Sequence, residues 1–216
     1  MDLLNRLERP LGWIAIGGLP VYVVAAQAIL FVWTMLNPGS AHLLMMDPYL
    51  VVQGHEWWRV LTFLFLVPFD NAIWAFFFLY FQFVCGQALE NEWGSFRLTL
   101  FYLLGALGCI AAAFIVGQDL SAAFFLNDTV FLAFAALYPD YQVYLFLILP
   151  LRVKWLAWFV WARILLTMIG SPWLFRLGIV VSLANYFIFF SGHHVQTVRE
   201  LIARARHRRR YRGFDE

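Results

Sequence analysis

Long stretches without charge alternate with short polar stretches along most of the chain, and this pattern predicts membrane-spanning helices. A helix needs about 20 mostly apolar residues to cross a bilayer. Six stretches approach or reach this length, at residues 18–36, 71–89, 98–117, 120–138, 154–170 and within 177–198. Asp128 interrupts the fourth stretch and Arg163 the fifth. The sixth helix is expected to begin near Trp173 and to end near Gly192.

Turn-forming residues separate several of these stretches. Proline occurs in each of the segments 37–39, 139–140 and 171–172, where we expect the chain to turn. The connection between the first two stretches, residues 37–70, is long for a compact domain. Its segment 56–66 is too short to span and too apolar to lie in water, so we expect it in the membrane interface. There Trp57 and Trp58 would lie among lipid headgroups, and Arg59 would bond to backbone carbonyls or phosphates.

Composition supports a membrane protein. Apolar residues make up 63% of the 216 residues and charged residues 13%, whereas soluble domains average nearer half and a quarter. A soluble protein of this size has too small a core to hide so many apolar side chains. The expected fold class is therefore an all-α integral membrane protein with six transmembrane helices. Residues 1–198 would form the membrane domain, and residues 199–216 a basic tail.

The basic residues predict an orientation. If six helices span, one side of the membrane receives most of them, namely Arg6, Arg9, Arg97, Arg152, Lys154 and the seven arginines between 199 and 212. The other side receives only Arg59 and Arg176. Cytoplasmic loops carry an excess of Lys and Arg, so both termini are expected in the cytoplasm, in a bacterial inner membrane. The tail would bind anionic lipid. No folded nucleic-acid module accompanies it, so the expected partners include membrane lipids and no nucleic acid.

Neither cysteine nor histidine suggests a cofactor. Cys85 and Cys109 lie inside apolar stretches and form no paired-cysteine motif, which gives no reason to expect a disulfide or a metal. The five histidines are scattered over both expected sides of the membrane, and this is a poor arrangement for a metal site. We expect no metal and no small-molecule cofactor.

Two short motifs add a family resemblance. Trp58-Arg59 lies in the long connection, and Gly86-x-x-Leu89-Glu90-x-x-x-Gly94-Ser95-x-Arg97 follows at the end of the second stretch. Their order and spacing resemble the rhomboid superfamily of intramembrane serine proteases, over roughly residues 54–156. The resemblance implies a rhomboid-like bundle of six helices with a long interfacial first loop. The residues that carry it are Trp58, Arg59, Gly86, Leu89, Glu90, Gly94 and Arg97.

The catalytic residues of that family are missing at the matching positions. Rhomboids hydrolyse a peptide bond with a serine on the fourth span and a histidine on the sixth. The resemblance places the nucleophile at Phe124 and the general base near Asn185, and it places second-span oxyanion donors at Trp74 and Phe78. Phenylalanine has no group that can act as a nucleophile. The chain is therefore expected to be a pseudoprotease and not an enzyme.

A rearranged site stays open as an alternative. Ser121 is the hydroxyl nearest to the counted nucleophile position. A dyad with His193 is excluded by the expected topology, because a membrane about 30 Å thick separates two groups that must approach to about 3 Å. A dyad of Ser121 with His42 or His55 is not excluded. The alternative is then an active rhomboid-type intramembrane serine endopeptidase.

Polar residues inside the spans suggest what an inactive member would do. Asp128 and Arg163 lie at matching depths, and Asn127 is adjacent; these residues could line a groove for a client's transmembrane segment, or form a structural ion pair. Segment 62–65 also faintly resembles the derlins, an inactive branch that helps to move or extract membrane proteins. We interpret the chain as a pseudoprotease that binds transmembrane client proteins laterally, for quality control, trafficking or assembly. A small polytopic transporter or channel is a further alternative.

Overall fold

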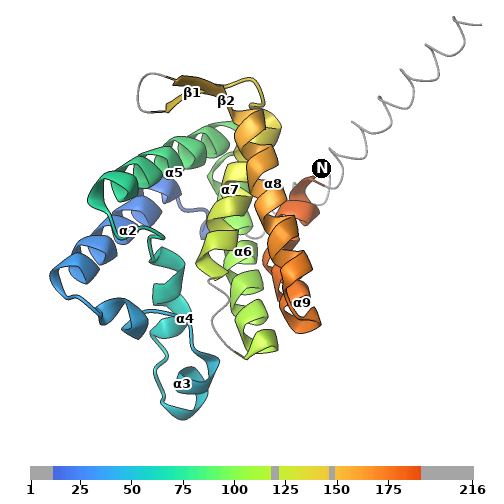
Figure 1. Ribbon diagram of the computed structural model, residues 1–216. Coiled ribbons are helices and arrows are strands. Elements are labelled where there is room, and N and C mark those ends of the chain that lie inside the picture. Colours follow the sequence, from blue (N-terminus) through green and yellow to red (C-terminus); the bar gives the residue numbers. More distant parts are fainter. Residues whose placement is uncertain (1–11, 118–121, 146–148, 191–216) are drawn as a thin grey trace, which may run out of the picture. The chain divides into compact units, whose positions relative to one another are not determined.

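The computed structural model describes residues 12–117, 122–145 and 149–190 (Figure 1). They fall into two compact units, one within Met1–Tyr186 and one from Phe187 onward. The expected domain boundary at 198 lies outside the described residues. The elements are η1 (Gly12–Ile14), α2 (Leu19–Leu36), η2 (Ser40–Leu43), α3 (Pro48–Gln53), α4 (Arg59–Thr62), η3 (Phe63–Phe65), α5 (Ala72–Trp93), α6 (Ser95–Val116), α7 (Ala122–Leu137), β1 (Gln142–Leu145), β2 (Leu149–Arg152), α8 (Val153–Gly170) and α9 (Trp173–Ser182).

The helices are those of a multi-pass membrane protein. Within the described ranges, four are long and apolar enough to span, namely Gly12–Leu36, α5, α6 and α8. A bent pair, Trp173–Ser182 and Ala184–Phe190, would make a fifth span if it counts as one. Helix α7 has 16 residues and is about 24 Å long, which is shorter than the hydrocarbon core of about 30 Å. Four or five spans are thus found within the described ranges, and the expectation of six spans stays a prediction.

Local sequence explains where several helices begin and end. Proline lies in the first turn of α2, where its missing N–H costs nothing. The Asn71 side chain accepts a hydrogen bond from the Ile73 N–H at 2.9 Å and caps α5. Gly117 ends α6 with a positive φ of 78°, a conformation that glycine adopts without strain. Helix α8 stops at Gly170, before Ser171 and Pro172.

Helix α7 is the central element of the unit up to Tyr186. It contacts α5, α6, α8, α9 and η3, and Figure 1 shows it between α5 and the pair α8 and α9. Most of its described side chains are buried, among them Phe125, Leu126, Val130, Leu132 and Phe134. A helix that is apolar and buried on most of its sides belongs to the interior of the bundle.

Gly108 brings α6 and α9 unusually close. A Cβ atom placed on Gly108 would lie 2.7 Å from the Val181 carbonyl oxygen, so the two backbones approach as only glycine permits. One turn earlier, a Cβ atom on Gly105 would lie 2.6 Å from the side-chain nitrogen of Asn185, which follows α9. Small residues serve this purpose in membranes, where helices gain little from hydrophobic burial against each other.

The mostly helical fold agrees with the expected all-α membrane protein, and one short β-hairpin lies between α7 and α8. Strands β1 and β2 are antiparallel, with Gln142 opposite Arg152 and Leu145 opposite Leu149. The turn expected at Pro139-Asp140 leads directly into β1. The Lys154 N–H donates to the Pro139 carbonyl at 3.1 Å. The hairpin therefore attaches the beginning of α8 to the end of α7.

Candidate functional site

The long motif builds the junction between α5 and α6. Gly94 ends α5 and begins α6 with φ at 80°, and Leu89 is fully buried. One oxygen of the Glu90 carboxylate accepts from the Gly18 N–H at 2.8 Å and from the Ser95 hydroxyl at 2.7 Å. Glu90 thereby binds the first N–H groups before α2, a place where negative charge is favourable.

Two further motif residues belong to the same junction. A Cβ atom on Gly86 would lie 2.8 Å from Pro20 Cβ, so this glycine lets α5 approach the first turn of α2. Arg97 is partly buried in the first turn of α6. The motif thus has a structural explanation, since it holds three helices together.

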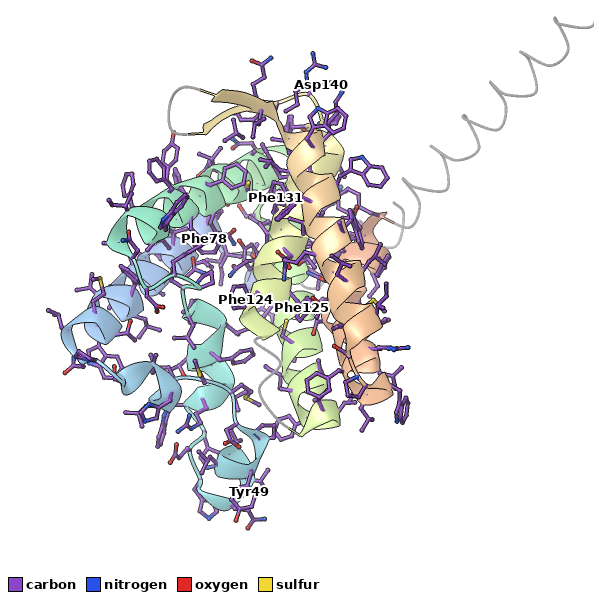
Figure 2. All side chains as sticks on the ribbon, in the orientation of Figure 1. Tyr49, Phe78, Phe124, Phe125, Phe131 and Asp140 are labelled. Carbon is purple, nitrogen blue, oxygen red and sulfur yellow. The ribbon has the colours of Figure 1, made fainter. Side chains whose placement is uncertain are left out.

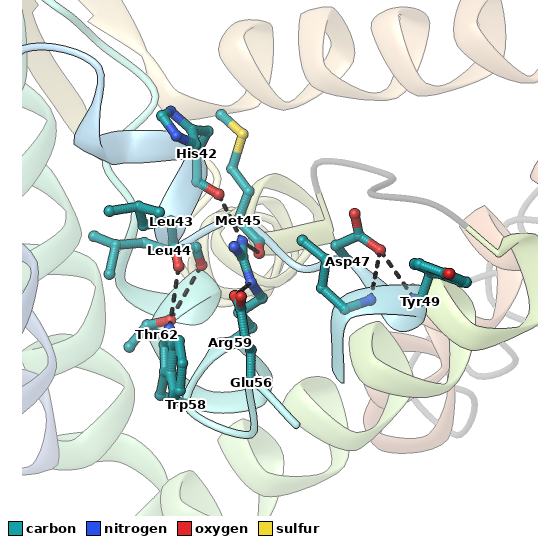
Figure 3. Close-up of polar contacts among 11 residues, drawn as sticks. His42, Leu43, Leu44, Met45, Asp47, Tyr49, Glu56, Trp58, Arg59 and Thr62 are labelled. Carbon is teal, nitrogen blue, oxygen red and sulfur yellow. Dashed lines mark hydrogen bonds and ion pairs between the residues drawn. The ribbon is translucent and has the colours of Figure 1, made fainter. Parts of the chain in front are cut away.

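Trp58 and Arg59 fold the long connection onto itself (Figure 3). The buried Arg59 guanidinium donates to the carbonyls of His42 at 2.6 Å and Met45 at 2.9 Å. It also pairs with the Glu56 carboxylate at 2.5 Å. The indole N–H of Trp58 donates to the Leu43 carbonyl at 3.3 Å. Arg59 was expected to bond to backbone carbonyls or to lipid phosphates, and the structure shows bonds to backbone carbonyls.

The positions that the rhomboid resemblance assigns to the nucleophile and to the oxyanion donors carry aromatic side chains. Phe124 lies in the first turn of α7 and is 39% exposed (Figure 2). On α5, Trp74 is exposed and Phe78 is partly buried, with its ring 5.7 Å from that of Phe69. Neither phenylalanine has a nucleophilic or hydrogen-bonding group, and the only such group of the three side chains is the indole N–H donor of Trp74.

Asn185, which the resemblance assigns to the general base, does not contact α7 at the level of Phe124. Its amide donates to the Thr129 hydroxyl at 3.0 Å and to the Phe101 carbonyl at 3.4 Å. Thr129 is five residues beyond Phe124, or about 7.5 Å along the axis. The base position counted from the resemblance therefore falls about one turn too far along the chain. The residues one turn earlier, Val181 and Ser182 of α9, are not histidines either.

Among the described residues, no serine hydroxyl forms a hydrogen bond with a histidine side chain. In the described residues, the Ser40 and Ser182 hydroxyls are buried without a hydrogen-bond partner, while those of Ser95 and Ser171 bond to Glu90 and to the Thr167 carbonyl. None of these hydroxyls bonds to His42 or His55. Ser121 and His193 lie outside the described residues.

The structure brings Asp128 and Arg163 together. Arg163 on α8 donates to the carboxylate of Asp128 on α7. The Asp128 side chain is 15% exposed, but that of Arg163 is 40% exposed. The pair therefore joins the central helix to the surface of the bundle, and it does not lie wholly in the interior.

Asn127 is separate from this pair and belongs to a buried cluster of amides. Its side-chain oxygen accepts from Gln82 Nε2 at 2.9 Å and from Gln27 Nε2 at 3.5 Å. These three amides come from α7, α5 and α2, and all are buried. The sequence analysis did not predict Gln82 or Thr129 as buried polar residues, although Gln82 interrupts an aromatic stretch of α5.

Comparisons with known proteins add no constraint. Among the described residues, no group of three or more metal-ligating side chains occurs. Comparison of the chain with protein-family models, with curated proteins and with solved structures returned no match. The resemblance to rhomboids therefore stays a prediction from the sequence motifs.

Proposed function

We propose that this chain is a rhomboid-like pseudoprotease that binds transmembrane segments of client proteins laterally, without peptide hydrolysis. In this proposal the chain crosses the membrane six times, with α7 as a short central crossing and a bent sixth one. Both termini lie in the cytoplasm, in a bacterial inner membrane, and the partners are lipids and transmembrane clients. Quality control, trafficking and assembly are the processes that such binding would serve.

The observation that carries the proposal is the exposed state of α8. Only Val153 and Ile164 of this helix are buried, whereas Trp158, Phe159, Leu166 and Ile169 are largely exposed. Its contacts are with α7, α9 and β2. A helix that is held on one side and apolar on the other can pack against an additional span without disturbing the core.

The absence of hydrolysis is supported by the counted positions. Phe124 offers no nucleophile, Phe78 offers no oxyanion donor, and Asn185 bonds to Thr129. The competing interpretation, an active serine endopeptidase, depends on Ser121. A fluorophosphonate probe reacts with activated serines and therefore separates the two. We expect no labelling of the purified protein, and labelling that Ser121→Ala abolishes would establish the protease instead.

Site-specific photocrosslinking tests client binding. A photoreactive amino acid replaces Leu166 on α8, which is 69% exposed, or Val32 on α2, which is 54% exposed and serves as the matched control. The protein is reconstituted with a single-span model client. We expect crosslinks mainly from position 166 and an intact client afterwards. Equal yields from the two positions would contradict lateral binding at α8, and cleavage of the client would contradict the pseudoprotease.

A further inference from the structure

Arg163 lies in the middle part of α8, away from both ends of the helix. It lies seven residues before the end of α8 at Gly170 and ten after its beginning at Val153, or about 10 Å and 15 Å from the two ends. Side chains of a helix lean toward its N-terminus. The Arg163 side chain therefore leans away from the nearer end, and this opposes the usual escape of arginine to the interface.

Asp128 satisfies only part of the guanidinium. An arginine has five N–H donors, and among the described residues the one side-chain partner of this guanidinium is a carboxylate oxygen of Asp128. With 40% of its side chain exposed, Arg163 presents the remaining donors on the apolar surface of α8. An unmade hydrogen bond is costly in hydrocarbon, so an acceptor from another spanning segment would be bound there.

The surroundings admit a second helix. On the same face of α8, Phe159 is 71% and Leu166 is 69% exposed. Thr167 and Gly170 follow Arg163 at helical spacing, and a Cβ atom on Gly170 would meet nothing within 4 Å. Small residues at such spacing let two helices approach closely. A second copy of this chain would offer its own Arg163 to the same face, a donor against a donor, and is therefore disfavoured.

We propose that Arg163 selects client spans that carry a side-chain amide, asparagine or glutamine, near the middle of the membrane. The inference rests on the proposed function and names the client feature that this site would recognise. An amide oxygen accepts from the free donors of Arg163 and brings no charge to a pair that Asp128 already neutralises. A lysine in the client would be repelled by Arg163, and a leucine would leave the donors unpaired.

The test measures the binding of model spans in lipid vesicles. A leucine-rich spanning peptide carries leucine, glutamine or lysine at its centre, and its association with the full-length protein is followed by energy transfer. Interhelical hydrogen bonds in membranes are modest, so we expect the glutamine peptide to bind roughly three- to twenty-fold more tightly than the leucine peptide. The lysine peptide should bind no more tightly than the leucine peptide. Moving the glutamine two turns toward either end should abolish its advantage.

Variants assign the preference to the pair. In the double variant Asp128→Leu and Arg163→Leu, which leaves no unpaired charge, glutamine and leucine peptides should bind equally. The control Val32→Leu on α2 should keep the preference. Equal binding of glutamine and leucine peptides by the wild-type protein would overturn this inference and leave lateral binding intact. A glutamine advantage that survives the double variant would also overturn it, and failure of every peptide to bind would overturn both proposals.

Discussion

The two sides of α7 differ in how its neighbours are held. On one side, α6 and α9 approach each other closely at Gly108, and Asn185, which follows α9, bonds to Thr129 of α7. Toward α8, the polar link among described residues is the ion pair of Asp128 with Arg163. In a bilayer, close backbone approach favours association because lipid competes poorly with it. We therefore expect the side of α6 and α9 to be the permanent side of the bundle, and the side of α8 to be the loose side.

The largest effect is expected from breaking the ion pair on one side only. Asp128→Leu leaves Arg163 in an apolar span without a counterion, which costs about 3 kcal/mol on insertion scales. The double variant with Arg163→Leu removes both charges and should recover most of this loss. Equilibrium unfolding in mixed micelles measures both variants. If the two single losses simply add in the double variant, the residues are not coupled.

A smaller loss should follow from filling the contact between α6 and α9. In Gly108→Ala, the new Cβ atom would lie 2.7 Å from the Val181 carbonyl oxygen. A backbone atom cannot rotate away, so the helices must separate, at a cost of about 1–3 kcal/mol. Unfolding of the purified variant gives this value.

Gly170→Ala on α8 is the matched control. A Cβ atom at this position meets nothing within 4 Å, and alanine favours the helix by up to about 1 kcal/mol over glycine. This variant should be neutral or slightly stabilised. Equal destabilisation by the two substitutions would remove the distinction between the close-packed and the loose side of α7.

The apolar stretches predicted most of the helices, because a span is determined by length and hydrophobicity alone. The stretches 18–36 and 154–170 match α2 and α8 to within one residue, and 71–89 and 98–117 match α5 and α6 to within four residues. The hairpin was not predicted, since strands of four residues carry too few positions for an alternating pattern.

The candidate site was predictable only in part. Charged residues alone in apolar spans are rare enough to be noticed, and Asp128 and Arg163 were paired by their depth. The separation of Asn127 from Asp128 could not be foreseen, because adjacent residues of a helix point about 100° apart and the partners depend on which helices lie on each side. The contacts of Gly105 and Gly108 depend in the same way on the tertiary packing of α6 with α9.

A third prediction compares two threonine hydroxyls. Thr129 accepts a hydrogen bond from Asn185, between helices, whereas Thr167 on α8 donates only to the Arg163 carbonyl of its own helix at 2.9 Å. Thr129→Val should destabilise by about 1 kcal/mol, as interhelical hydrogen bonds in membranes do. Thr167→Val should change stability by less than about 0.5 kcal/mol. A reversed order, measured by the same unfolding assay, would contradict the assignment of the permanent side.

The smallest effect concerns Asp140, which lies outside the candidate spans, and Lys154 at the beginning of α8. The Lys154 ammonium donates to the Asp140 carboxylate at 2.9 Å, and this hydrogen bond, with the charge of Lys154, lowers the pKa of Asp140 below its usual value. A carboxyl group whose pKa is lower in the folded state stabilises the fold above its unfolded pKa, and it loses this contribution as the pH falls through the folded value.

The carboxyl resonance of Asp140 should therefore titrate below the ordinary aspartate range, and in Lys154→Met its midpoint should rise toward that range. Because both side chains are exposed to solvent, salt should weaken the shift. An Asp140 midpoint that is the same in the wild type and in Lys154→Met would show that the side chains do not bind α8 to the end of α7. The hydrogen bond from the Lys154 N–H to the Pro139 carbonyl would then be the contact that joins the beginning of α8 to the end of α7.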